Sequence, residues 1–204
     1  MASIGRRRDV DDDDVASPFK HAFGGAMGWF GVLNVKKPGG ATSRDAVDHV
    51  QRLVRPAKAG HAGTLDPLAT GVLVICVGQA TRLIRYVQRM PKTYRAQFLL
   101  GRRSETDDIE GQVELMDDCS RPAREAVDHV IAQFIGEIEQ KPPAHSAIKL
   151  AGRRAYQLAR KGAEFELTPR PVVVHRIIVR RYEYPELELD IECGSGTYVR
   201  ALGR

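Results

Sequence analysis

The stretch Gly60-His61-Ala62-Gly63-Thr64-Leu65-Asp66-Pro67-Leu68-Ala69-Thr70-Gly71 runs directly into the apolar segment Val72-Leu73-Val74-Ile75-Cys76-Val77. Such a short apolar segment, ended by Gly78, predicts a buried strand. The preceding dodecamer predicts a loop, because its glycines permit backbone turns that other residues resist. Pro67 fixes its own φ and moves Asp66 away from helical backbone angles. We therefore expect the Asp66 carboxylate at a stiff bend beside the strand.

The residues of this loop have two interpretations. A carboxylate on a rigid loop next to a packed strand is a frequent arrangement in catalytic sites. Asp-Pro is also a common turn opener, and Asp66 could simply accept a backbone hydrogen bond there. His61, on the same loop, could contact a substrate or could serve only as a hydrogen-bonding structural residue.

Composition limits the class of protein. The chain has 204 residues, of which 43% are hydrophobic, enough for one packed domain with extensions. Its net charge of +5 favours an anionic partner such as nucleic acid. The three cysteines, Cys76, Cys119 and Cys193, lack metal-binding or redox spacing, so we expect reduced thiols. No segment has the pattern of a secretory signal or the length of a membrane span, so we expect a cytoplasmic protein without a membrane partner.

The hydrophobic pattern divides the chain into a tail and one folded domain. Residues 1–27 combine a basic triplet, an acidic run and a glycine-rich stretch, and are predicted to be a disordered tail. In the N-terminal half we expect a buried strand over 29–35, a helix after Thr42 or Ser43 that Pro56 closes, a helix over 81–89 and a strand over 93–100.

The C-terminal half continues the alternation. We expect a polar loop over 101–111, a helix with Pro122 in its first turn and Gly136 just past its end, a short strand over 146–150 and a basic helix over 153–161. Residues 172–184 and 187–193 predict two strands joined as a hairpin, the second with one wet face. This order favours an α+β domain with a mixed, mainly antiparallel sheet flanked by helices.

The dodecamer resembles the signature of the TruB family of tRNA pseudouridine synthases, Gly-His-x-Gly-x-Leu-Asp-Pro-x-Ala-x-Gly, at every fixed position. The resemblance extends from about Gly28 to the end of the chain through further landmarks: Gly101-x-x-x-x-Thr106-Asp107-x-x-x-Gly111, Pro142-Pro143 with Ser146-Ala147-Lys149, Gly152-x-x-x-Tyr156-x-x-Ala159-Arg160 and Gly196-Thr197-Tyr198-x-Arg200. It implies the pseudouridine synthase fold and isomerisation of the uridine at tRNA position 55, in the T-loop, on a flipped-out base. It implies the tRNA T-arm as partner, a monomer, and no metal or other cofactor.

The resemblance also implies roles for individual residues. Asp66 corresponds to the family's essential aspartate, acting as nucleophile or as base; the sequence does not choose between the two. Tyr94 corresponds to a tyrosine that stacks on the target base, and Tyr198 to a second ring that faces the substrate. His61 corresponds to a substrate contact that fills space left when bases leave the stack.

Arg200 and Lys37 complete the expected site. Arg200 follows a glycine turn that would open a helix, where the helix dipole disfavours a cation, so a partner carboxylate is indicated. A buried ion pair with Asp66 would keep that carboxylate ionised. A solvated arginine, or a phosphate contact at the Gly-x-Gly turn, is the alternative. Lys37 stands where the family has Lys-Pro, and we expect it to contact RNA together with other basic residues: Lys36, Lys58, Arg82, Arg85, Arg89, Lys92, Arg95, Arg102, Arg103, Arg153, Arg154, Arg160 and Lys161.

The sequence departs from the family pattern at both ends. The tail is extra, and the chain ends at Arg204, where family members finish the catalytic domain and add a small PUA-like RNA-binding domain. We therefore expect residues 28–204 to form an incomplete catalytic domain. Two alternatives remain open: a non-catalytic RNA-binding or tRNA-folding protein, and a metal-dependent hydrolase using His61, Asp66, Asp107 and Asp108.

Overall fold

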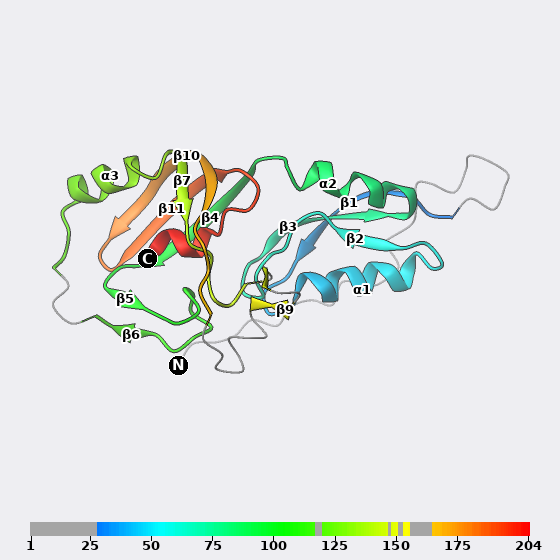
Figure 1. The fold of residues 1–204 in the computed structure, drawn as a ribbon, viewed down its shortest axis with the longest axis horizontal. Coiled ribbons are helices and arrows are strands. Elements are labelled where there is room, and N and C mark those ends of the chain that lie inside the picture. Colours follow the sequence, from blue (N-terminus) through cyan, green and yellow to red (C-terminus); the bar gives the residue numbers. More distant parts are fainter. Residues whose placement is uncertain (1–27, 117–119, 147, 151–152, 156–164) are drawn as a thin grey trace, which may run out of the picture.

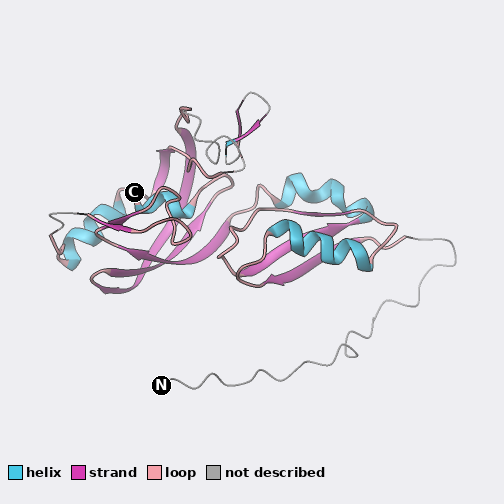
Figure 2. Ribbon diagram, turned by 90° about the horizontal axis from the view of Figure 1, so that it is seen from below, coloured by secondary structure: helices cyan, strands magenta, loops and turns pink. Residues whose placement is uncertain are grey.

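The structure, a computed structural model, describes residues 28–116, 120–146, 148–150, 153–155 and 165–204 (Figure 1). Two antiparallel sheets lie side by side along the long axis of the molecule, each with helices against it (Figures 1 and 2). All strand pairs in the described residues are antiparallel. The predicted α+β class is confirmed.

The first sheet contains three strands in the order β1-β3-β2. Its strands are β1 (Gly31–Lys37), β2 (Ala59–His61) and β3 (Gly71–Val77). The buried strand predicted over 72–77 is confirmed as β3, in which Leu73 and Ile75 are buried. The strand expected over 29–35 begins later and is not buried as predicted, because β1 is an edge strand whose side chains are largely exposed. Strand β2 had no sequence prediction; it is only three residues long, and it places His61 at a strand end.

Helix α1 (Ser43–Leu53) packs against the three-stranded sheet through Val47 and Val50. Of the two cap candidates, Thr42 is the N-cap. Its side chain accepts a hydrogen bond from Asp45 N, and the Asp45 carboxylate accepts one from Thr42 N, which forms a capping box. This helix therefore begins where the sequence predicts.

The single helix predicted over 81–89 is not present, and the structure corrects that prediction. The chain turns at Gly78 into a 3₁₀ helix, η2 (Gly78–Leu83), and then makes a single α-helical turn, α2 (Ile84–Val87). The prediction assumed one α-helical period for the apolar residues Leu83, Ile84 and Val87. The segment instead changes from three residues per turn to 3.6 between Leu83 and Ile84.

The second sheet has four strands in the order β4-β11-β10-β7. They are β4 (Lys92–Leu99), β7 (Gly136–Gln140), β10 (Arg170–Glu183) and β11 (Glu186–Cys193). The hairpin predicted between the last two strands is confirmed, and its strand β11 buries Leu187, Leu189, Ile191 and Cys193 against the core. Strand β4 pairs with β11 along its whole length, so Tyr94 lies opposite Ile191.

Helix α3 (Arg124–Ala132) packs on this sheet through Val127. Two details of its prediction are corrected: Pro122 precedes the N-cap Ala123, and Gly136 starts strand β7 instead of ending the helix. Gly136 has φ of +109°, which lets the chain turn from the end of the helix into the strand.

Two short hairpins complete the described fold. Strand β5 (Arg102–Arg103) lies in the segment 101–111 that was expected to be a loop, and it pairs with β6 (Glu114–Leu115), for which no prediction was made. Strands β8 (Lys149–Leu150) and β9 (Arg153–Arg154) pair as well, so the basic helix predicted over 153–161 does not begin at Arg153. The rest of that prediction, Cys119 and the tail lie outside the described residues. Among the described helices, none is long and apolar enough to cross a membrane.

Candidate active site

The loop that carries Asp66 is held on both sides of the carboxylate. On one side, Ser43 Oγ donates to Leu65 O at 3.1 Å and accepts from Leu65 N at 2.9 Å. On the other side, Pro67 O accepts hydrogen bonds from Gly40 N at 2.9 Å and from Lys37 Nζ at 3.0 Å. The stiff bend predicted from Pro67 is therefore reinforced by side chains from the start of α1 and the end of β1.

Lys37 is fully buried, at 0% exposure. Its Nζ donates to three backbone carbonyls: Ala41 O at 2.6 Å, Pro38 O at 2.9 Å and Pro67 O at 3.0 Å. An ammonium group has three N–H donors, and all of them are used here. Burial lowers the pKa of Lys37, while the nearby Asp66 carboxylate opposes that shift. We predicted a phosphate contact for Lys37, but this geometry gives it a different task, which is to fix the loop that carries Asp66.

The predicted pairing of Arg200 with Asp66 is present. Arg200 lies in η3 (Val199–Gly203), directly after strand β11 and its glycine turn. Its Nε is 3.3 Å from Asp66 Oδ2, although the N–H is not aligned for a hydrogen bond. The Arg200 side chain is 12% exposed and that of Asp66 is 41% exposed. The cation is therefore buried, and the carboxylate remains open to a ligand on one side.

Asp108 is the functional neighbour that the sequence prediction missed. Arg200 Nη1 is 2.9 Å from Asp108 Oδ2 and also donates to Thr106 O at 2.8 Å, while Nη2 donates to His145 O at 2.7 Å. The Asp108 carboxylate also accepts from Thr106 Oγ1 and from Glu110 N. The nearby Thr106-Asp107 landmark could have indicated this loop, but Asp108 was considered only as a metal ligand.

The charges around Asp66 act in opposite directions. Burial raises the pKa of the Asp66 carboxyl above its usual value, and the Asp108 carboxylate adds to the rise. Arg200 and Lys37 lower the pKa and so favour the ionised form. The net shift is upward, which makes Asp66 a more basic carboxylate than one in water.

The two predicted tyrosines lie on separate elements, and the charge of Asp66 influences both. Burial raises the pKa of both Tyr94, on β4, and Tyr198, just before η3, and the Asp66 charge contributes to each rise. Both rings therefore lie within electrostatic range of the carboxylate. His61 lies apart from this network: its Nδ1 is 2.5 Å from Gly63 O, and it forms no ion pair with Asp66 in the described residues.

The alternative of a metal-dependent hydrolase receives no support from the geometry. In the part of the chain that the structure describes, no group of three or more His, Cys, Asp or Glu side chains could hold a metal ion. Asp108 instead binds Arg200, and Asp107 Oδ2 lies 3.6 Å from Arg204 Nε. The acidic residues of that alternative are therefore engaged by arginines.

The sequence profile described as TruB family pseudouridylate synthase (N terminal domain) matches residues 51–199. The chain belongs to the TruB family. It is 47% identical over 177 residues to tRNA pseudouridine synthase B of Gloeothece citriformis and 49% identical over 175 residues to that of Caulobacter sp.. Each alignment covers 85% of this chain.

Solved structures support the same family and fold. A Cbf5-Nop10-Gar1 complex matches with a TM-score of 0.61 at 29% identity, covering 85% of this chain and 42% of that chain. An H/ACA RNP bound to a substrate RNA containing 2′-deoxyuridine matches with a TM-score of 0.59 at 26% identity, covering 85% and 40%. This TruB-family chain spans 57% of the length of the Gloeothece relative and 56% of the Caulobacter one.

Proposed function

We propose that this protein is a tRNA pseudouridine synthase that isomerises the T-loop uridine at position 55. Residues 28–204 belong to its catalytic domain. The observation that carries the proposal is the Asp66 carboxylate, held on a braced loop 3.3 Å from a buried arginine and partly open to solvent. The curated relatives named tRNA pseudouridine synthase B support the same reaction class.

The proposed reaction breaks the N1–C1′ bond of uridine, turns the base, and forms a C5–C1′ bond. The C5 proton passes to solvent, and N1 takes up a proton from solvent. A carboxylate beside the ribose can act as a nucleophile at the sugar or as a base. Arg200 and Lys37 keep Asp66 ionised, and burial makes it more basic, so both roles are served. Tyr94 and Tyr198 supply aromatic faces for a base that has left its stack. No atom is gained or lost, so the balance requires no co-reactant.

The experiment measures release of tritium from tRNA labelled at C5 of uridine, with carbodiimide mapping of the modified position. We expect the wild-type protein to release label only from tRNA that carries uridine at position 55. Asp66→Asn should reduce the rate by about 10³-fold or more, because the amide lacks the lone-pair basicity of the carboxylate. Asp128→Asn, which changes an exposed helix carboxylate, is the matched control and should retain wild-type activity.

Two outcomes would oppose the proposal. Unchanged label release by Asp66→Asn would remove this residue from the chemistry. Tight tRNA binding by the wild-type protein without any conversion of uridine would instead favour the RNA-binding or tRNA-folding alternative.

A further inference from the structure

Gln140 is a buried polar residue at the end of strand β7, with 6% of its surface exposed. Its side-chain amide makes two hydrogen bonds to the backbone of one residue, Tyr198, which lies 58 positions later in the chain. Nε2 donates to Tyr198 O at 3.0 Å, and Oε1 accepts from Tyr198 N at 2.8 Å. The two bonds pair the amide with the peptide groups on both sides of Tyr198, as a neighbouring strand would.

These two hydrogen bonds hold the backbone at Tyr198, the residue after which η3 begins. Tyr198 O also accepts the hydrogen bond from Ala201 N, at 3.1 Å. Arg200 is two residues past Tyr198, so any shift of the Tyr198 backbone moves the guanidinium that lies beside Asp66. In the segment before Tyr198, Ser195 and Gly196 are exposed, and Gly196 has φ of +87°.

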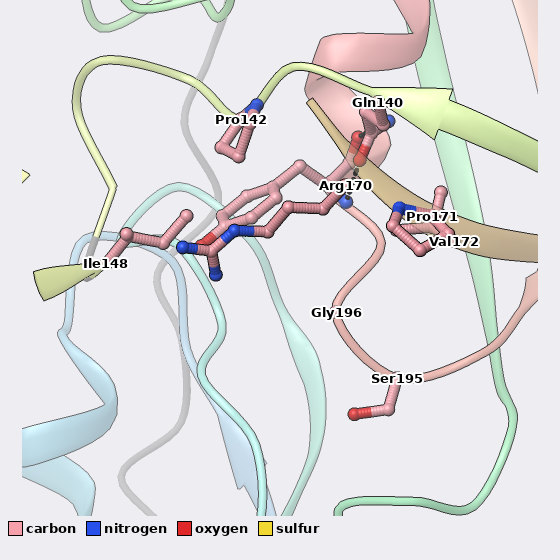
Figure 3. Close-up of a pocket in the computed structure, with 9 residues that line it drawn as sticks. Gln140, Pro142, Ile148, Arg170, Pro171, Val172, Ser195 and Gly196 are labelled. Carbon is pink, nitrogen blue, oxygen red and sulfur yellow. Dashed lines mark hydrogen bonds between the residues drawn. The ribbon is translucent and has the colours of Figure 1, made fainter. Parts of the chain in front are cut away.

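Figure 3 shows Gln140 beside Arg170 and Pro142, with the Ser195–Gly196 turn farther along the loop that approaches it. These residues line a small cavity of about 140 Å³, and Tyr198 forms part of the same wall. The turn therefore borders open space, and the Gln140 amide joins its far end to the sheet, as Gly194 N does at its start by donating to Val173 O at 2.8 Å.

We propose that Gln140 is a positioning residue for the reaction, whose amide holds the Tyr198 backbone so that the Tyr198 ring and the Arg200 guanidinium lie at Asp66. The inference rests on the proposed function. The hydrogen bonds of the Gln140 side chain among the described residues go to the Tyr198 backbone, so it acts through the residues that it orients.

A displaced Arg200 would have a recognisable electrostatic effect. The charged or titratable groups that face Asp66 are Arg200, Asp108, Lys37, Tyr94 and Tyr198. Arg200 is the largest influence that lowers the pKa of Asp66. If Arg200 is less well placed, the pKa of Asp66 rises further, and the acidic limb of the rate profile moves to higher pH.

The experiment compares Gln140→Met with Gln51→Met under single-turnover conditions, with tRNA labelled at C5. Methionine keeps the length of the side chain and removes both hydrogen bonds. Gln51 is a matched control, because its side-chain amide also makes two hydrogen bonds to the backbone. Its Nε2 donates to Ala57 O, and its Oε1 accepts from Ala59 N. Both substitutions remove two partly buried hydrogen bonds, and both are expected to lower the midpoint of thermal unfolding.

Only Gln140→Met should change the chemistry. We expect its single-turnover rate constant to fall by about 10- to 100-fold, with KM for tRNA changed by less than about threefold. Its acidic limb should move upward by about half a pH unit or more. Gln51→Met should keep the wild-type rate constant and limb. If Gln140→Met is not recovered folded, Gln140→Asn replaces it; its shorter amide reaches one partner only, and shifts in the same directions are expected.

The outcomes separate this inference from the proposed function. A wild-type protein that forms no pseudouridine would overturn the proposed function itself. The positioning role would be overturned if the wild-type protein is active and the Gln140 variants lose only thermal stability. Their rate constant and the acidic limb of their pH–rate profile would then match those of Gln51→Met, and the reaction would stay assigned.

Discussion

The Arg200 guanidinium lies 2.9 Å from the Asp108 carboxylate, closer than the 3.3 Å that separates it from Asp66. The Asp108 side chain is 9% exposed, so this pair is largely removed from water. The Arg200 guanidinium thus hydrogen-bonds directly to Asp108 and to two backbone carbonyls, while its longer contact with Asp66 is not aligned as a hydrogen bond. The arrangement leaves the Asp66 lone pairs free for a substrate and keeps a positive charge beside them.

Asp108→Asn should therefore affect both folding and activity. Removing the closest negative charge from a buried arginine is expected to lower the free energy of unfolding by about 2–4 kcal/mol and the single-turnover rate by about 10-fold or more. Urea unfolding and label release measure these effects.

Asp107→Asn is the control for this prediction, since Asp107 is the adjacent carboxylate and its closest arginine is Arg204, at 3.6 Å. We expect its effects to be clearly smaller. Equal effects of the two substitutions would mean that the general negative charge of the loop matters, and not the specific contact with Arg200.

Lys37→Met should weaken the loop that carries Asp66. The substitution removes three hydrogen bonds from an ammonium group to buried carbonyls, and we expect the free energy of unfolding to fall by about 2–4 kcal/mol. Lys36→Met, at the exposed neighbouring position, should leave stability nearly unchanged. Chemical denaturation of both variants, with filter binding of tRNA, provides the measurement. If Lys37→Met loses much of its tRNA affinity while its stability is unchanged, the result would support the predicted contact between Lys37 and RNA and oppose the role in fixing the loop.

Sequence patterns predicted those elements that depend on interactions between residues close together in the chain. Thr42 with Asp45 gives a capping box, and the alternation from Leu187 to Cys193 gives a half-buried strand, so both positions follow from the sequence. The Arg200–Asp66 pair was also predicted, from the family resemblance at Gly196-Thr197-Tyr198-x-Arg200 together with the expectation that a cation at a helix start needs a partner carboxylate. The rest depends on contacts between distant segments. Nothing near Gln140 in sequence indicates that its amide would bind the Tyr198 backbone.

Burial of a charged residue was the other feature that local patterns did not show. Lys37 was expected to contact RNA, because it stands where the family has Lys-Pro. The carbonyls that bind it come from the turn after β1 and from Pro67, thirty residues later, which only meet in the folded chain.

Gly78→Ala should strongly destabilise the protein. Gly78 has φ of +59°, and a Cβ at this position would lie 2.4 Å from Trp29 O. The left-handed backbone costs an L-residue about 1–2 kcal/mol, and the close approach to a backbone oxygen adds to that. Gly28→Ala, where a Cβ meets nothing within 4 Å, is the matched control and should keep the wild-type midpoint of urea unfolding. A wild-type midpoint for Gly78→Ala would show that the turn between β3 and η2 differs from the one described.

Asp190 makes the stability of the second sheet depend on pH. Its carboxylate, on β11, accepts hydrogen bonds from Arg95 Nε at 2.9 Å and Arg180 Nε at 2.6 Å. The hydrogen bond from Arg95, followed by that from Arg180, lowers the pKa of Asp190 from 3.8 to about 2. A folded-state pKa below the unfolded value gives stability that is fully present above about pH 4 and is lost as the pH falls toward 2. Asp190→Asn should therefore unfold at a lower temperature than wild type at pH 7, and the two melting temperatures should converge between pH 4 and pH 2.

Glu192→Gln, two positions along the same strand face, provides the comparison for Asp190→Asn. Its nearest arginine nitrogen, Arg176 Nη2, is 3.6 Å away, and no hydrogen bond joins the two side chains among the described residues. The melting temperature of Glu192→Gln should stay close to wild type at pH 7. Added salt should reduce the effect of Asp190→Asn, because its arginine partners are partly exposed and their attraction is screened. A melting-temperature difference for Asp190→Asn that persists unchanged at pH 2 would mean that packing, and not the charge of Asp190, stabilises this part of the sheet.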